Sequence, residues 1–291
     1  MNYENKVKVN DTFLNVYSEG KNSESTIIFM SGSGVTSPVL EYKPIYRRMS
    51  NVYKIAVVEK AGYGFSGSMT TKRTVENLVE ESRKALLLSG INPPYVLAPH
   101  SYSGFEAIYW ANTYPDEVKA ILGMDMGFPN MALAQAKEIP ETQKEKMVIQ
   151  QRKILSVVAK RGFLAKLLKN KTINVSGLMT GNELTDEEKA LYEKLFYKNL
   201  LNQEISEEAL LMTENAVKTH NTGILTCPAC FYISNLKSPV KSITWQNAGI
   251  AYAKQCGGEV HLSEQGHMMY ALIPDEMADT FKAFLKKINI I

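Results

Sequence analysis

YVLAPHSYSGFEA, residues 95–107, joins an apolar run of strand length to small residues that open a helix, and Ser101 lies at the junction. A turn this sharp presents the serine hydroxyl clear of the sheet edge, with a helix N-terminus directly behind it. Ser103 and Gly104 are small enough for strand and helix to approach closely, and Pro99 fixes φ without adding bulk along the chain. Ser101 is therefore a candidate nucleophile, although an ordinary strand-to-helix turn gives the same pattern in isolation.

The composition of the 291-residue chain is that of a soluble globular protein, with 45% hydrophobic and 22% charged residues. This length suits one large α/β domain with an insertion, or two modest domains. The net charge of +3 comes from scattered lysines, so we expect neither nucleic-acid nor membrane binding. A polar N-terminal stretch and an odd number of cysteines predict a cytoplasmic location.

Two of the three cysteines, Cys227 and Cys230, form a Cys-x-x-Cys pair at the start of an expected strand. An odd offset sends the two thiols to opposite faces of a strand. The pair is therefore not expected to form a redox or metal site.

Apolar runs of strand length alternate with helical patterns through most of the chain, which predicts a mostly parallel sheet covered on both faces. A hairpin turning at Asn10-Asp11 is expected to form the antiparallel edge. Two of the buried runs are followed by glycine-containing loops, Ser31 to Gly34 and Glu59 to Ser66. The strands are expected near residues 7–9, 13–17, 26–30, 54–58, 95–100, 119–124, 229–233 and 259–262.

Helices are expected at Tyr42 to Met49, after an N-cap at Thr74, behind Ser101, over Ile243 to Lys254, and from Pro274 onward. From Gly127 to Thr226 strands disappear and helical segments follow one another. These comprise amphipathic content over Pro140 to Lys169 with a break at Gly162, a helix opened by a capping box at Thr185, and another opened at Ser206.

The helical segment 127–226 is predicted to be a lid over the active site, because insertions at the carboxyl edge of a parallel sheet are where ligands bind. An insertion that only completes the core is the alternative. Its methionines either line a malleable pocket or simply pack; they include Met131, Met147, Met179 and Met212.

Four stretches together resemble the α/β-hydrolase family, and along the chain they follow in the family's order: the Ser31 to Gly34 loop, residues 95–107, Asp125 and Gly266-His267. Residues 95–107 are similar to the G-x-S-x-G elbow, with Pro99 and Ser103 where the outer glycines usually stand. The Ser31 to Gly34 loop is similar to the H-G-x loop, with serine in place of the commoner histidine. Asp125 follows the next strand, and Gly266-His267 follows the last. The resemblance implies an eight-stranded, mostly parallel sheet flanked by helices, built from residues 1–126 and 227–291, with a helical cap at 127–226 inserted after strand 6.

The same resemblance implies a serine hydrolase that works through an acyl-enzyme without a metal or organic cofactor. Ser101 is the nucleophile, His267 the general base, and the backbone N–H groups of Ser33 and Tyr102 form the oxyanion hole. A serine argues against the branches that use aspartate as nucleophile. A small or medium ester is the expected substrate, with amide, thioester and lactone as close alternatives. His100 is expected to be a packed structural residue.

The acid of the triad departs from the family pattern. Its usual place after the seventh strand falls at Ser234 to Lys237, which contains no carboxylate, and no Asp or Glu occurs between residues 223 and 258. Asp125 is predicted to take the role, because parallel strands bring their carboxyl ends to one edge of the sheet. A capping role for Asp125 is one alternative, and Asn235 as a neutral orienter of the histidine is another.

Two other functions remain open at this point. A ligand receptor or pseudoenzyme keeps the pocket without useful turnover, because fold does not fix function. An iminopeptidase-like enzyme needs cap acids to hold a substrate amine, and the candidates are Glu187, Glu188, Glu207 and Glu208. Acids at helix starts more often have a capping role.

Overall fold

The computed structural model of the chain describes residues 2–140, 142–143, 145–146, 148–150, 153, 173–200, 202–238 and 240–290. Most of the helical content expected over 140–169 lies outside the described residues, as do Gly162 and Met147.

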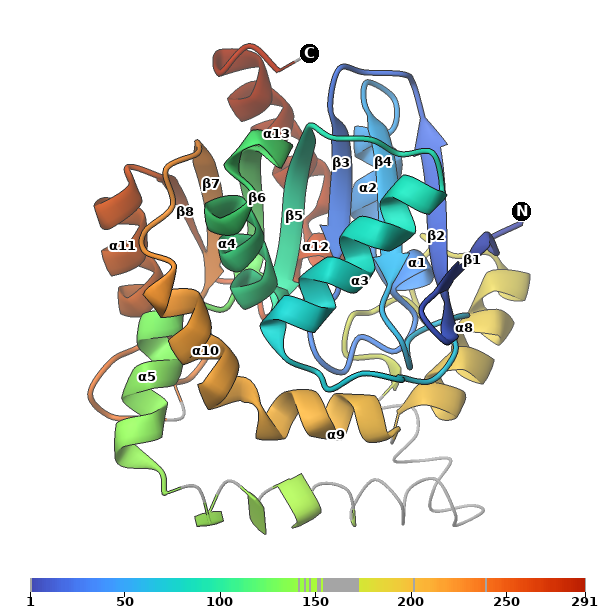
Figure 1. Cartoon of the computed structure of the whole chain (residues 1–291). Coiled ribbons are helices and arrows are strands. Elements are labelled where there is room, and N and C mark those ends of the chain that lie inside the picture. Colours follow the sequence, from blue (N-terminus) through green and yellow to red (C-terminus); the bar gives the residue numbers. More distant parts are fainter. Residues whose placement is uncertain are drawn as a thin grey trace.

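One eight-stranded sheet forms the centre of the molecule (Figure 1). Its strands are β1 (Lys6–Val9), β2 (Thr12–Gly20), β3 (Thr26–Met30), β4 (Lys54–Glu59), β5 (Tyr95–Ser101), β6 (Val118–Met126), β7 (Ala229–Ser234) and β8 (Glu259–Ser263). They lie in the order β1-β2-β4-β3-β5-β6-β7-β8. The β1–β2 and β2–β4 pairs are antiparallel and the other pairs are parallel. The predicted mostly parallel sheet with an antiparallel edge is confirmed.

Helices cover both faces of the sheet, which explains why its inner strands are apolar along their whole length. In β3, Ile27 and Phe29 belong to one buried cluster, and Ile28 and Met30 to the cluster on the opposite face. One face carries α3 (Val75–Leu88), α4 (Ser103–Thr113) and α11 (Trp245–Cys256). The other carries α1 (Pro38–Glu41), α2 (Lys43–Met49), α12 (Met269–Leu272) and α13 (Pro274–Lys287), and a 3-10 turn, Pro115–Glu117, precedes β6.

The predicted helix starts at Thr74 and Thr185 are confirmed. The Thr74 hydroxyl accepts the N–H of Asn77, and Thr185 and Glu188 form a reciprocal capping box. The helix expected over residues 42–49 is confirmed as α2, and the short helix α1 precedes it. The helix expected from Ile243 begins at Trp245, because the Thr244 side chain caps it.

Between β6 and β7 the described residues contain α5 (Pro129–Glu138), α8 (Asp186–Asn199), α9 (Gln203–Leu210) and α10 (Met212–Asn221). In Figure 1, α9 and α10 run along the lower edge of the sheet. The prediction that Ser206 opens a helix is wrong: the Asn202 side chain accepts the N–H of Ile205 at 2.9 Å and starts α9 four residues earlier. Asparagine caps helices about as well as serine, so the sequence contained two competing start signals.

The helices of the described residues include none that is long and apolar enough to cross a membrane.

The start of α4 lies against the chain that leaves β6, at a distance that only glycine permits. A Cβ added at Gly104 would lie 2.2 Å from the carbonyl oxygen of Gly127. Gly104→Ala is therefore expected to destabilise the protein by about 1–3 kcal/mol or more through overpacking. Gly266→Ala is the matched control, because a Cβ there has no atom within 4 Å. Urea denaturation compares the two variants, and equal midpoints would contradict the close approach.

Candidate active site

Ser101 is the last residue of β5 and has a φ of 53°, in the left-handed region that non-glycine residues rarely adopt. Such backbone strain costs on the order of 1–3 kcal/mol and clusters at functional sites. The Ser101 carbonyl oxygen accepts the N–H of Gly127 at 2.6 Å, which ties the turn to the chain that leaves β6. The sharp turn expected at Ser101 is present.

Ser103 explains why this elbow needs no glycine at its outer position. Its hydroxyl lies 2.9 Å from the carbonyl oxygens of Met30 and His100, and it accepts the N–H of His100 at 3.0 Å. The hydroxyl therefore joins the end of β5 to the end of β3, directly before the Ser31 to Gly34 loop.

The Ser31 to Gly34 loop packs directly against Ser101. A Cβ at Gly32 would lie 2.7 Å from the Ser101 Cβ and 3.0 Å from the His100 carbonyl oxygen, so only glycine fits there. Tyr63 supports the loop from outside, because its hydroxyl oxygen accepts the N–H of Gly34 at 3.4 Å. The loop backbone thus lies beside the predicted nucleophile.

Asp125 and His267, 142 residues apart in the chain, are hydrogen-bonded to each other. The distance from His267 Nδ1 to Asp125 Oδ2 is 2.5 Å. With Nδ1–H donated to the carboxylate, Nε2 of the neutral ring is the proton acceptor. The Asp125 side chain is fully buried and that of His267 is 22% exposed. The carboxylate therefore holds the Nδ1 side of a histidine ring that is partly open to solvent.

Three further hydrogen bonds hold the Asp125 carboxylate. Ser234 at the end of β7 donates its N–H at 2.8 Å and its hydroxyl at 2.7 Å, and Trp245 donates its indole N–H at 2.7 Å. Burial alone would raise the pKa of Asp125, but the hydrogen bonds from His267 and Ser234 hold it below its ordinary value. Asp125 also has a φ of 51°, so strained backbone occurs at both Ser101 and Asp125.

Asn235 does not face the histidine. It is exposed, and its side-chain amide donates to Glu264 at 2.9 Å. This contact leaves Asp125 as the residue that holds His267 Nδ1.

His100 is buried, as expected, and its ring lies against that of His267. The two rings are 4.5 Å apart, and His100 Nε2 is 3.1 Å from the His267 carbonyl oxygen. Burial, together with the neighbouring His267, lowers the pKa of His100 to about 3. His100 therefore stays neutral at physiological pH and supports the histidine loop without adding charge.

Beside the elbow, a buried ion cluster joins the sheet side of the site to α9. We define the Glu208 cluster as Lys60, Arg73, Glu81, Glu106 and Glu208. Lys60 Nζ lies 2.9 Å from Glu106 and 3.3 Å from Glu208, and Arg73 lies 3.1 Å from Glu81 and 3.2 Å from Glu208. All five side chains are buried.

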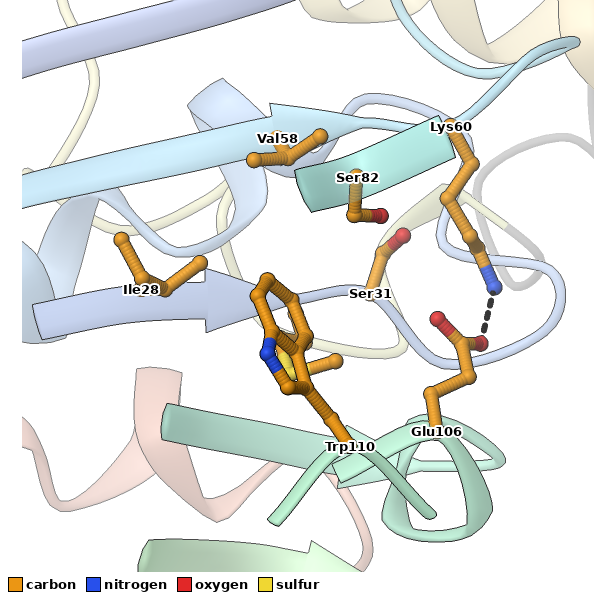
Figure 2. Close-up of a pocket in the computed structure, with 8 residues that line it drawn as sticks. Ile28, Ser31, Val58, Lys60, Ser82, Glu106 and Trp110 are labelled. Atoms are coloured by element: carbon orange, nitrogen blue, oxygen red, sulfur yellow. Dashed lines mark hydrogen bonds and ion pairs between the residues drawn. The ribbon is translucent and has the colours of Figure 1, made fainter. Parts of the chain in front are cut away.

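Figure 2 shows the Lys60–Glu106 pair facing a small cavity that Ser31 and Ser82 also line. Its space of about 10 Å³ is close to that of one water molecule. The Ser31 hydroxyl is buried and has no hydrogen-bond partner within the described part of the chain. The small Ser31 side chain therefore borders a cavity with polar lining residues next to the Ser31 to Gly34 loop.

The Glu208 cluster reaches the site through two tyrosines. Tyr63, which supports the Ser31 to Gly34 loop, donates its hydroxyl to Glu208 at 2.7 Å. Lys60 Nζ lies 5.4 Å from the ring centre of Tyr102, whose hydroxyl oxygen also accepts the side-chain N–H of Asn215 on α10 at 2.5 Å. Both predicted oxyanion-hole segments therefore contact residues of the 127–226 insertion directly or through one side chain.

Sequence reasoning missed this cluster because Glu208 was interpreted as a helix-start acid. Burial alone would raise the pKa of Glu208, but Lys60 and Arg73 lower it. Burial raises the pKa of Glu106 despite its ion pair with Lys60. Lys60 and Arg73 are more than 130 residues from Glu208 in the chain, and no sequence pattern indicates that these side chains are in contact.

No family model matches the chain. A Bacillus subtilis protein described as uncharacterized protein YbdG is 36% identical over 215 residues, which is 74% of this chain. The chain spans 63% of that relative's length. A Bacillus megaterium epoxide hydrolase solved with an inhibitor matches with a TM-score of 0.71 and 16% identity, covering 97% of this chain and 100% of that one. A haloalkane dehalogenase loop variant, DbeA-M1 from Bradyrhizobium elkanii, matches with a TM-score of 0.62 and 14% identity, over 98% and 96% of the two chains.

The chain has the α/β-hydrolase fold. Ser101 lies at the turn between β5 and α4, and Ser234 is the last residue of β7, at the place where the sequence resemblance leads one to expect the acid. Ser234 instead donates two hydrogen bonds to a carboxylate supplied by the neighbouring strand β6.

Glu208→Gln should lower the free energy of unfolding by about 3–5 kcal/mol, because it removes one partner from two buried cations. Glu214→Gln is the matched control. Glu214 also pairs with two cations, Lys72 and Lys218, but its side chain is 42% exposed, so a loss below about 1 kcal/mol is expected. Urea denaturation near neutral pH measures both.

The pH dependence of this difference has a defined sign. A carboxylate whose pKa is lowered by folding stabilises the protein above its unfolded pKa, and the contribution is lost as the pH falls through the folded pKa. The gap between wild type and Glu208→Gln should therefore shrink in acid. A Glu208→Gln variant as stable as Glu214→Gln at neutral pH would show that the cluster contributes nothing.

Proposed function

We propose that this protein is a serine hydrolase that cleaves a small or medium ester through an acyl-enzyme, with Ser101, His267 and Asp125 as its catalytic triad. The observation that carries the proposal is the buried Asp125 carboxylate bonded to His267 Nδ1, at the sheet edge where the strained Ser101 turn also lies. This is the arrangement of base and orienting acid that a serine nucleophile requires.

In the proposed reaction, Ser101 Oγ attacks the substrate carbonyl carbon while His267 Nε2 takes the hydroxyl proton. The backbone N–H groups of Ser33 and Tyr102 hold the oxyanion of the tetrahedral intermediate. Collapse of the intermediate breaks the bond to the leaving alcohol, which receives the proton from His267. Water then attacks the acyl-enzyme with the same base and releases the acid and free Ser101.

The identity of the nucleophile, aspartate or serine, determines whether an enzyme of this fold can turn over alkyl or acyl substrates. An aspartate that attacks the carbon of an epoxide or a haloalkane opens the ring or displaces the halide and forms an alkyl ester, which water can hydrolyse at the carboxyl carbon. Serine attack on the same substrates would leave an ether on Ser101, which has no carbonyl for water to attack. The serine therefore favours acyl substrates, although the structural neighbours include an epoxide hydrolase and a haloalkane dehalogenase.

The insertion 127–226 is proposed to act as the lid that selects the acyl group. Met212 packs against the cluster that contains Tyr102 and Phe105, and Asn215 bonds the Tyr102 hydroxyl. These contacts hold the insertion against the residue that follows Ser101. Amide, thioester and lactone substrates remain alternatives to the ester.

The contacts of the cap acids disfavour an iminopeptidase. Glu188 is paired with Lys43, Glu208 with Lys60 and Arg73, and Glu207 accepts the backbone N–H of Arg73. These three acids are already engaged by this chain's own groups. Glu187 is exposed.

Asp125→Asn should reduce kcat for a p-nitrophenyl acetate-type ester by on the order of 10⁴, because the amide cannot hold the productive histidine tautomer or stabilise its cation. Asn235→Ala should change kcat by less than about twofold, since Asn235 is exposed and its side-chain amide donates to the exposed Glu264. Steady-state kinetics on purified variants measure both, with Ser101→Ala as the zero-activity reference.

Circular dichroism and the thermal midpoint show whether both variants are folded. A folded Asp125→Asn enzyme with near wild-type kcat, or a larger loss in Asn235→Ala, would refute the assignment of the acid. Hydrolysis undiminished in Ser101→Ala would refute the mechanism, and no hydrolysis of any ester by wild type would favour the receptor alternative.

A further inference from the structure

Three ligand-type side chains meet on the last two strands of the sheet. Cys230 lies on β7, and Glu259 and His261 lie on β8. The strand register pairs Cys230 with Glu259 and Tyr232 with His261. Because side chains two residues apart point to the same face of a strand, the thiol, the carboxylate and the imidazole all face one side. One ligand atom from each lies within 4.8 Å of the other two.

Two of these three groups have no other bonding role. Within the described residues, neither the Cys230 sulfur nor the His261 ring nitrogens make a hydrogen bond, and Cys230 forms no disulfide. The His261 ring stacks on Tyr232 with centres 5.1 Å apart and planes 21° apart. Stacking holds the ring flat and leaves its nitrogens at the ring edge, where an imidazole binds a metal in its own plane.

Access and charge also fit a divalent cation. Cys230 is fully buried, whereas Glu259 and His261 are half-buried, so the group opens to solvent on one side. A thiolate and a carboxylate together carry two negative charges, which a divalent ion neutralises. Lys287 of α13 already forms an ion pair with Glu259 and therefore competes with a metal ion for it.

We propose that Cys230, Glu259 and His261 form a binding site for a borderline-soft divalent metal ion of the zinc type. Thiolate, imidazole and carboxylate are the donors that Zn²⁺ takes in proteins, whereas Mg²⁺ and Ca²⁺ require oxygen ligands. Binding releases the Cys230 proton to solvent, uses His261 in its neutral form, and exchanges the Lys287 ammonium for the metal at Glu259. Water completes the four-coordinate shell.

No local sequence pattern indicates this site, because it combines Cys230 with residues of the next strand and not with Cys227. Cys227 lies before β7 and packs against the core cluster on the opposite face of the sheet from Cys230. The ion would join β8 to β7; β8 is a five-residue strand at the edge of the sheet, and it ends four residues before His267. Its expected role is therefore structural.

Cobalt is the probe of choice, because Co²⁺ replaces Zn²⁺ in tetrahedral sites and a cobalt–thiolate bond absorbs in the near ultraviolet. Titration of the reduced, chelator-treated full chain with Co²⁺ should give this band at one ion per chain, and Zn²⁺ should abolish it. Cys230→Ala should remove the band. His261→Gln and Glu259→Gln should weaken Co²⁺ binding by about tenfold or more.

The chain supplies its own controls. Cys227→Ala and Cys256→Ala remove the other two thiols and should keep the band. Lys287→Met removes the competing cation and should tighten Co²⁺ binding. If Cys230→Ala does not fold, the half-buried His261→Gln and Glu259→Gln variants decide the matter, because Zn²⁺ should raise the Tm of wild type and not theirs.

No thiolate band in folded wild type would overturn the proposal. So would a band that persists in Cys230→Ala or disappears in Cys227→Ala or Cys256→Ala. Equal Co²⁺ affinity of wild type, His261→Gln and Glu259→Gln would show metal bound elsewhere on the surface.

Discussion

The Asp125 carboxylate is the constraint around which the catalytic edge of the sheet is arranged. An ionised carboxylate without partners would cost several kcal/mol in this fully buried position. Four hydrogen bonds from three segments offset that cost: His267 after β8, Ser234 at the end of β7, and Trp245 at the start of α11. The group that orients the histidine thereby also joins two neighbouring strands and a helix, so its removal affects the geometry of the whole edge.

The elbow is held in the same way, by contacts between strand ends. The Ser101 carbonyl oxygen bonds the chain that leaves β6, and the Ser103 hydroxyl bonds the end of β3. Gly32 and Gly104 permit these approaches because they have no Cβ. Charged and polar groups then fasten α9 and α10 to the loops beside the elbow. Loss of one member of the Glu208 cluster would leave a buried charge unpaired, which is strongly destabilising. These ion pairs therefore hold α9 in a fixed position beside the elbow.

The sequence was sufficient for the sheet, most helices and the pairing of Asp125 with His267. Apolar runs and glycine-containing loops are local signals, and parallel strand ends meet at one edge, so the absence of any acid after β7 pointed to β6. The donors Ser234 and Trp245 were not predictable, since a serine and a tryptophan have no distinctive spacing from the acid that they serve. His100 was placed in the interior correctly, but its contact with His267 depends on the path of a loop 167 residues away. Glu208 was misjudged because Ser206-Glu207-Glu208 looks like a helix start, whereas Asn202 starts the helix and leaves Glu208 on its buried side.

The central claim is that Ser101 is a nucleophile activated by His267. Intact-protein mass spectrometry after incubation with a fluorophosphonate, followed by peptide mapping, tests it most directly, because the probe reacts with activated serines without regard to the natural acyl group. The account predicts one adduct per chain, located on Ser101, absent in Ser101→Ala and formed far more slowly in His267→Gln. Equal labelling of wild type and Ser101→Ala, or no labelling of folded wild type, would contradict it.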